Sequence, residues 1–147
     1  MYLLDTNILS EARKKKNANK GVINFFKAAT KNGSNLFLSV ITIGELRRGI
    51  ALIRHRGDTR QANLLEKWLN IILSEYQDNI LEFDVDSAQV WGELRSPHHE
   101  NALDKQIAAT ALTHGLTVVT RNEKDFSGTR VKVLNPFEYT QSDLNPG

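Results

Sequence analysis

Five short apolar runs recur along the chain, each too short for a helix and suited to a buried β-strand. They occupy residues 2–4, 36–40, 80–83, 117–120 and 131–134. Most of the intervals have helical periodicity, and over residues 59–76 the apolar positions fall on one broad face, which predicts a helix packed on a core. Short strands that alternate with helices predict an α/β fold with a mostly parallel sheet covered on both faces.

The composition is that of an ordinary globular protein, with 40% hydrophobic and 24% charged residues. A length of 147 residues predicts a single domain, residues 1–147, with the polar stretch 141–147 as a loose tail. No apolar run approaches the roughly 18 residues of a membrane span, and Asp5 interrupts the apolar start, so we expect no membrane segment and no signal peptide. The sequence has no cysteine, which fits a cytoplasmic protein.

Charge is distributed unevenly along the chain, although the net charge is only +2. Residues 11–60 hold twelve Lys or Arg and three Asp or Glu, whereas acidic residues outnumber basic ones in the rest. Such a basic region could face a polyanion, and solvated helix faces explain it equally well. The positions that we consider as phosphate contacts are Arg13, Lys14, Lys15, Lys16, Arg47 and Arg48.

Three acidic residues follow predicted strands. Asp5 comes directly after the first strand, Glu45 opens the helix after the second, and Asp125 lies just past the fourth. Ligands of open α/β sheets bind beyond the carboxyl ends of the strands, near a switch in strand order. We therefore expect these three carboxylates to converge on one edge of the sheet.

Asp104 is the acidic residue whose position is most informative. Helical spacing places it in the middle of an apolar stripe. The other members of that stripe are Ile107, Ala108, Ala111 and Leu112. A helix capped by Asn101 would favour an acidic residue in its first turn, which explains the residue type. It does not explain the inward direction, so a functional role is favoured.

A capping role also explains each of the other acidic residues when it is taken alone. Asp5 could cap the helix that follows it, and Thr42 with Glu45 matches a capping box. Asn122 could likewise cap a short turn that contains Asp125. Only the coincidence of four acidic groups at helix starts distinguishes a shared site from four separate caps.

Four carboxylates at one site would repel one another unless a cation joined them. Mg²⁺ suits such a site, because it takes oxygen ligands and is typically bound by one or two carboxylates with waters and phosphate oxygens. The adjacent residues His98 and His99 are a weaker candidate for a metal pair, since neighbouring histidines in a loop with a proline rarely face one ion.

Four stretches of the chain, in this order, resemble the PIN-domain ribonuclease toxins of bacterial toxin–antitoxin pairs, the VapC type: LLDTNILSE, TIGELRRGI, DKQIAATALTHGLTVVTRNEKDF and VKVLNPF. The similarity covers almost the whole chain. It implies a three-layer α/β/α sandwich with a mostly parallel central sheet. It also implies a metal-dependent endoribonuclease whose catalytic residues are Asp5, Glu45, Asp104 and Asp125.

The same resemblance implies more detail about the centre. Asp5 and Asp104 would be the principal ligands of Mg²⁺, for which Mn²⁺ can substitute, and Asn7, Thr120 and Asn122 match supporting polar positions. The family often has an acidic residue where Asn122 stands, so either Asn122 or Asp125 could mark the fourth acidic position. A further departure from the family pattern is Lys105, which would place a cation near the rim of the pocket.

The resemblance further implies partners: an RNA substrate, a cognate antitoxin bound in a groove with a basic side chain that reaches the acidic pocket, and a second copy in a homodimer. The expected reaction is cleavage of single-stranded or loop RNA by a metal-activated water, with the basic residues given above as RNA-binding positions. Two alternatives remain open at this point. One is a receiver-like signalling module that accepts a phosphate, and the other is a PIN module that binds RNA or antitoxin without catalysis.

Overall fold

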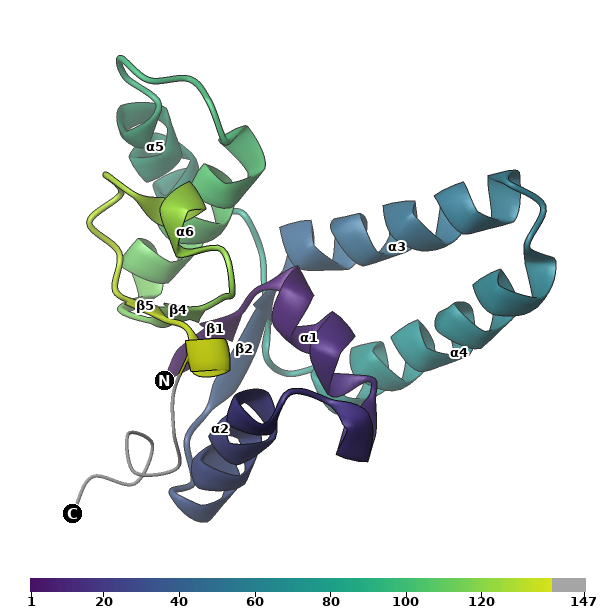
Figure 1. Cartoon of the computed structure of the whole chain (residues 1–147). Helices are drawn as coiled ribbons and strands as arrows, with labels where there is room; N and C mark the ends of the chain where they lie inside the picture. Colours follow the sequence, from purple (N-terminus) through teal and green to yellow (C-terminus); the bar gives the residue numbers. More distant parts are fainter. Residues whose placement is uncertain (139–147) are drawn as a thin grey trace.

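The computed structural model describes residues 1–138, which form a five-stranded sheet in which neighbouring strands are parallel. The strands are β1 Tyr2–Leu4, β2 Leu36–Ser39, β3 Ile80–Leu81, β4 Thr117–Val119 and β5 Val133–Leu134. Their order is β3-β2-β1-β4-β5, so β1 is central (Figure 1). The predicted parallel α/β sheet is confirmed, whereas the predicted tail at 141–147 lies outside the described residues.

Helices connect the strands within residues 1–138. The α-helices are α1 Thr6–Ala12, α2 Lys20–Lys31, α3 Val40–His55, α4 Thr59–Glu75, α5 Val85–Leu94 and α6 Ala102–His114. Short 3-10 helices are η1 Lys15–Asn17, η2 Glu123–Phe126 and η3 Pro136–Glu138. None of the helices in the described part is long and apolar enough to cross a membrane.

The sheet is covered on both faces, which confirms the three-layer α/β/α sandwich. Successive residues of a strand point to opposite faces. Leu3 and Val118 therefore join the core beneath α6, while Leu4 and Val119 join the core that α1, α2, α3 and α4 cover. Figure 1 shows α5 and α6 together on one side and α1 and α2 on the other.

Strand order locates the natural binding edge of this sheet. The chain moves from β1 outward to β2 and β3, and then returns to β4 and β5 on the opposite side of β1. The order therefore switches between β1 and β4, where ligands of open α/β sheets bind. The order also differs from that of receiver-like modules, 2-1-3-4-5, which counts against that alternative.

Helices α3 and α4 form a hairpin that extends away from the sheet (Figure 1). Its inner side is apolar and includes the buried residues Ile50 and Leu69. On the outside, the two helices are joined through Glu66: its Oε1 lies 2.7 Å from Nη1 of Arg47, and its Oε2 lies 3.1 Å from Nη2 of Arg54.

Several predicted strands are one or two residues too long at their ends. β2 ends at Ser39, whose hydroxyl accepts a hydrogen bond from the N–H of Ile41 at 3.0 Å and caps α3, so that Val40 begins the helix. The other differences are similar: Phe83 lies just after β3, Thr120 lies just after β4, and Val131 lies just before β5. The helix predicted over residues 59–76 is confirmed as α4, which ends at Glu75 with Tyr76 as its C-cap.

Candidate active site

The site is built around Asp5, which follows the central strand β1 and is only 4% exposed. Its Oδ1 accepts a hydrogen bond from the N–H of Thr6 at 2.8 Å, so Asp5 caps α1. Its Oδ2 accepts from the hydroxyl of Thr120 at 2.8 Å and from Nδ2 of Asn7 at 3.3 Å. Burial raises the pKa of the Asp5 carboxyl, although these hydrogen bonds act in the opposite direction. One oxygen of Asp5 therefore caps α1, while the other is held by the side chains of Thr120 and Asn7.

Hydrogen bonds from Asn7 and Thr120 join the end of β1 to the loop after β4. The Asn7 Nδ2 donates to Thr120 Oγ1 at 3.2 Å, and its Oδ1 accepts from the N–H of Arg121 at 3.0 Å. Thr120 Oγ1 also accepts from the N–H of Asn122 at 3.0 Å. The structure thus brings Asn7 and Thr120 to Asp5 through their side chains, whereas Asn122 contributes its backbone N–H.

Glu45 reaches the same site from the second turn of α3. Its Oε1 accepts a hydrogen bond from the hydroxyl of Thr6 at 3.2 Å. Burial raises the pKa of Glu45, and the negative charge of Asp5 raises it further. The capping-box interpretation is wrong, because Ser39 caps α3; Thr42 is buried within the helix, and its hydroxyl has no hydrogen-bond partner among residues 1–138.

Asp104 lies in the first turn of α6 and is partly buried, as its place in an apolar stripe predicts. Burial raises the pKa of its carboxyl to about 7, and the charges of three other carboxylates contribute to the rise. Those three, from the largest contribution to the smallest, are Asp5, Asp125 and Glu45. The prediction that Asn101 caps this helix through its side chain is wrong: the residue has a left-handed backbone, and its side chain makes no capping hydrogen bond.

Asp125 lies in η2, the 3-10 helix beyond β4, and is partly buried. Its N–H donates to the carbonyl of Asn122 at 3.1 Å, but the side chain of Asn122 makes no capping bond. Because the charge of Asp125 raises the pKa of both Asp5 and Asp104, it belongs to the same acidic centre. Asn122 itself is exposed, which favours Asp125 as the fourth acidic position.

A divalent cation fits the chemistry of this donor set. The four carboxylates come from the end of β1, from α3, from α6 and from η2, and the charges of their neighbours raise the pKa of Asp5, Glu45 and Asp104; a cation would remove that repulsion. Within residues 1–138, no three His, Cys, Asp or Glu side chains are arranged to bind one ion by themselves. The residues therefore suit an ion such as Mg²⁺, which keeps several waters and takes only one or two carboxylates.

Two contacts near the site did not follow from sequence reasoning. Thr6 donates hydrogen bonds to both acidic residues, from its N–H to Asp5 and from its hydroxyl to Glu45. The only indication of this in the sequence is that a residue with a hydroxyl directly follows Asp5. Lys105 is 5% exposed, and its Nζ donates to the carbonyl of His98, 2.6 Å away, in the loop before α6. The adjacent His99 accepts from Arg95 through its backbone carbonyl, and neither histidine belongs to a group of three His, Cys, Asp or Glu within residues 1–138 that could hold a metal ion.

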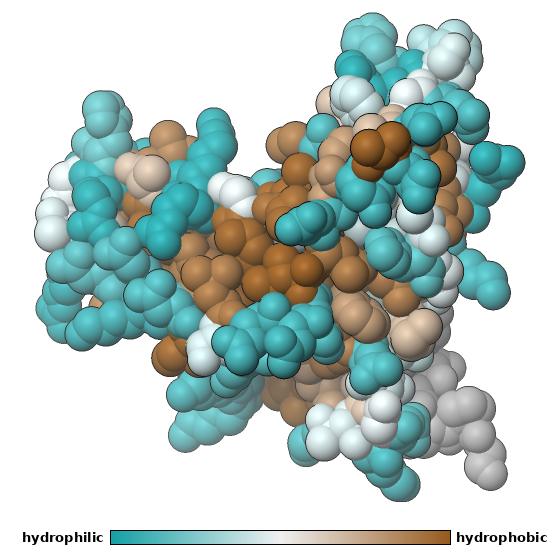
Figure 2. All heavy atoms as spheres, turned by 180° about the vertical axis from the view of Figure 1, so that it is seen from behind, coloured by the Kyte–Doolittle hydropathy of each residue, from teal (hydrophilic) through white to brown (hydrophobic). Residues whose placement is uncertain are grey.

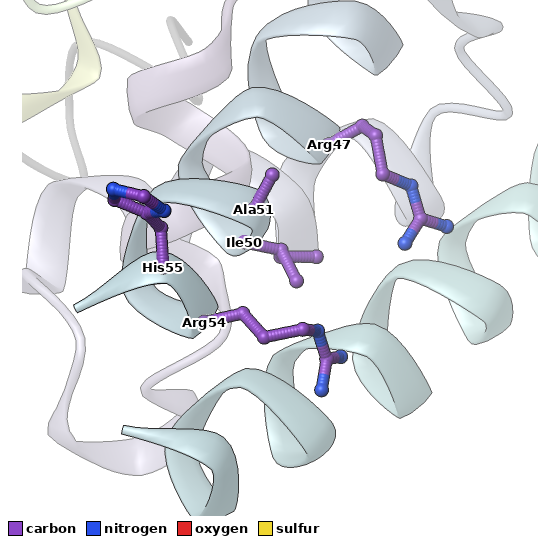
Figure 3. A pocket seen from close by; sticks show the side chains of 5 residues that line it. All are labelled: Arg47, Ile50, Ala51, Arg54 and His55. Carbon is purple, nitrogen blue, oxygen red and sulfur yellow. The ribbon is translucent and has the colours of Figure 1, made fainter. Parts of the chain in front are cut away.

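The basic residues considered as RNA contacts are not gathered in one place. Arg47 turns toward α4 and its partner Glu66 (Figure 3), and Lys14 lies 3.0 Å from Glu11. The guanidinium of Arg13 lies 6.0 Å from the ring centroid of Trp68. Lys15, Lys16 and Arg48 are exposed.

Comparison with known proteins decides the family. The model of the PIN domain matches residues 2–132 of the chain. The chain belongs to the PIN-domain family. Toxin FitB of Neisseria gonorrhoeae is 36% identical over 143 residues, which are 93% of this chain and 99% of FitB. The plasmid stability protein StbB of Pseudomonas syringae pv. tomato is 37% identical over 94% of this chain and 99% of its own length.

Other relatives of this PIN domain extend the comparison. The VapC ribonuclease Y4jK of Sinorhizobium fredii is 29% identical over 94% of this chain and 99% of its own length. The crystal structure of FitAcB from Neisseria gonorrhoeae superposes with a TM-score of 0.77 at 34% identity, and the match covers 95% of this chain and all of that one. These matches confirm the resemblance to VapC-type PIN toxins that the sequence motifs indicated.

Proposed function

We propose that this PIN domain is the toxin of a toxin–antitoxin pair and acts as a divalent-metal-dependent endoribonuclease on single-stranded or loop RNA. The observation that carries the proposal is the convergence of Asp5, Glu45, Asp104 and Asp125, where burial, with the charges of the other three carboxylates, raises the pKa of Asp104 to about 7. Relatives named as a toxin and as a VapC ribonuclease support it.

In this proposal Asp5 and Asp104 would hold the cation, Mg²⁺ or Mn²⁺. When bound, the ion neutralises the carboxylates and polarises the scissile phosphodiester. Asn7 and Thr120 keep the Asp5 carboxylate oriented through their hydrogen bonds. Asp125 adds negative charge on the β4 side of the centre, opposite Glu45 on α3.

Glu45 is the residue that we assign to the attacking water. Its Oε1 is held by Thr6, which leaves Oε2 to accept a proton from that water. The raised pKa of Glu45 suits this role, because a base whose pKa is closer to neutral accepts a proton more readily.

Substitution of the proposed ligands tests the activity. We expect Asp5→Asn or Asp104→Asn to lower Mg²⁺-dependent cleavage of single-stranded RNA at least about 100-fold, because a catalytic metal contributes several kcal/mol. Asparagine preserves the size of each side chain and can still cap α1. The measurement is the initial cleavage rate with Mg²⁺ and with EDTA.

Asp58→Asn is the matched control, because Asp58 also caps a helix, at the far end of the hairpin, through a 3.1 Å bond to the N–H of Gln61. Its cleavage rate should equal that of the wild type. Full cleavage by Asp5→Asn or Asp104→Asn would exclude the assigned centre. RNA binding by the wild type without any cleavage would support the catalytically inactive alternative instead.

For the antitoxin we assign the groove between α1, α2 and α4, a hollow of about 710 Å³. Its apolar lining includes Phe26, Trp68 and two α4 residues that are each 54% exposed, Leu64 and Ile71. Exposed apolar side chains that line one groove favour a protein partner. A solved toxin–antitoxin complex from Klebsiella pneumoniae, to which this chain is similar at 28% identity with a TM-score of 0.61, supports the partner class.

Co-purification tests this surface. We expect the Leu64→Glu, Ile71→Glu double variant to lose the protein encoded by the adjacent reading frame, which the wild type retains. Val85→Glu is the control, since Val85 is an apolar residue of α5 with 74% exposure. Equal retention by the double variant and the control would exclude this groove as the antitoxin site.

A further inference from the structure

Gly49 lies in the interior of α3, where a glycine lowers helix stability relative to alanine. Neither its backbone nor its neighbours require it: its φ is not positive, and a Cβ built there would meet no atom within 4 Å among the described residues. Gly21 shows the contrast, because a Cβ there would clash with the carbonyl oxygen of Pro136. The space beside Gly49 is therefore open, and nothing within residues 1–138 accounts for the glycine.

This open space lies beside the acidic centre. Gly49 follows Glu45 by four residues, so the two positions are neighbours on the same side of α3, one turn apart. Glu45 is held by Thr6 at the start of α1, and its pKa is raised by the charge of Asp5. An RNA chain that reached the acidic centre next to Glu45 would pass directly over Gly49.

Arg48 supplies a positive charge on the same side of the helix. It follows Glu45 by three residues and is exposed, and within residues 1–138 it forms no ion pair. Arg47 and Arg54 point in another direction, toward α4, where both are bound to Glu66 (Figure 3). Arg48 is thus the arginine of α3 that combines a free side chain with a place next to Glu45.

We propose that Gly49 and Arg48 form the surface over which the RNA backbone leaves the acidic centre. Gly49 lets the sugar–phosphate chain lie directly against α3, and Arg48 contacts a phosphate. This proposal rests on the proposed ribonuclease function and adds to it the path of the substrate. It also assigns a phosphate contact to Arg48 and none to Arg47, whose guanidinium pairs with Glu66 instead.

A bulky side chain at position 49 tests the path. In an Asp5→Asn background, in which we expect cleavage to be at least about 100-fold slower, Gly49→Leu should weaken binding of a labelled single-stranded RNA pool at least about tenfold, because it fills the path and displaces a phosphate contact. In the cleaving protein the same change should raise KM with little effect on kcat. Fluorescence anisotropy and initial rates give these two readouts.

Gly92→Leu is the matched control. Gly92 is an exposed glycine of α5, and a Cβ there also meets no atom within 4 Å. Both changes replace a helix glycine by a good helix former and should raise the Tm by about 1–4 °C. A gain in Tm with a loss of RNA binding at Gly49 alone would separate substrate contact from a structural role.

The charge is tested by the dependence of RNA binding on salt. Arg48→Ala should reduce the slope of log Kd against log salt by about 0.7, the value for one phosphate contact on a single strand. Arg47→Ala should leave the slope unchanged, because Arg47 is paired with Glu66.

Equal RNA affinity of Gly49→Leu and Gly92→Leu, with normal cleavage by the wild type, would overturn this proposal and leave the proposed function intact. Loss of antitoxin binding by Gly49→Leu with unchanged RNA affinity would also overturn it, since the surface would then belong to the protein partner. If the wild type neither bound nor cleaved RNA, the proposed function would fail together with this path.

Discussion

At the scale of single residues, the direction of a side chain was easier to predict than its hydrogen bonds. Helical spacing alone placed Asp104 inward, and the structure has it partly buried with a pKa of about 7. The caps were harder, because a cap depends on the residue at which a helix begins. α3 begins at Val40 rather than after Thr42, Asn101 has a left-handed backbone, and the side chain of Asn122 makes no capping bond, so only the predicted cap at Asp5 is confirmed.

The raised pKa of Asp104 predicts how stability depends on pH. The folded protein binds a proton that the unfolded chain, with a pKa near 3.8, has released, so the free energy of unfolding should fall as the pH rises from about 4 to about 7. Mg²⁺ should restore stability more at pH 8 than at pH 5, since it binds the ionised form. Thermal unfolding from pH 4 to pH 8, with and without Mg²⁺, measures both effects.

Asp104→Asn is the control for this dependence, because asparagine does not titrate. The variant should show a flatter pH profile and a smaller rise in Tm on addition of Mg²⁺. An unchanged profile would mean that Asp104 is not the group that titrates.

Lys105 should stabilise the loop before α6. Its ammonium donates to the carbonyl of His98 and is almost fully buried, so Lys105→Met should leave that carbonyl without this partner and lower the free energy of unfolding by roughly 1.5–3 kcal/mol. The exposed Lys132 provides the control, and Lys132→Met should change stability by less than about 0.5 kcal/mol. Denaturant titration compares the two; an equal effect would contradict the structural role of Lys105.

At the scale of elements, periodicity predicted the helix of residues 59–76 almost to its last residue, because its apolar face packs on the core. The strands were less certain at their ends, since apolar residues such as Val40 suit a buried strand and a buried helix equally well. What periodicity could not predict is that α3 and α4 form a projecting hairpin, which depends on how the two helices pack on each other (Figure 1).

The hairpin should owe its stability to its apolar side rather than to its ion pairs. Leu69 is fully buried between the helices and the core, so Leu69→Ala should lower the free energy of unfolding by about 2–5 kcal/mol. Glu66→Gln removes the negative charge that pairs with Arg47 and Arg54 at the surface and should lower the free energy of unfolding by less than about 1 kcal/mol. A larger effect of Glu66→Gln than of Leu69→Ala in denaturant titrations would reverse this ranking.

At the scale of the whole molecule, the parallel sheet and its binding edge followed from the alternation of strands and helices. The strand order could not be predicted, because the sequence of a short strand does not indicate which strands pair with it. Yet this order is what brings Asp5 next to the loop after β4. The uneven charge along the chain also proved a weak guide, since Arg13, Lys14 and Arg47 are engaged in different places by other side chains.

A homodimer remains a prediction of the family resemblance. Viewed from behind, apolar surface gathers in the middle of the molecule, between the α3–α4 hairpin and the helices α5 and α6 (Figure 2). An apolar surface of this kind suits a second copy of the chain. Light scattering coupled to gel filtration should give about twice the monomer mass of 16.6 kDa, and a monomeric mass at micromolar concentration would contradict the prediction.

The central claim is that Asp5 and Asp104 hold a divalent cation at the edge of the sheet. Anomalous X-ray scattering from a crystal soaked in Mn²⁺ tests it most directly, because the signal locates the ion without any assumption about activity. We predict a peak within coordination distance of the carboxylates of both Asp5 and Asp104, and its loss in Asp104→Asn. A peak elsewhere on the protein, or none at a saturating concentration of Mn²⁺, would contradict the account.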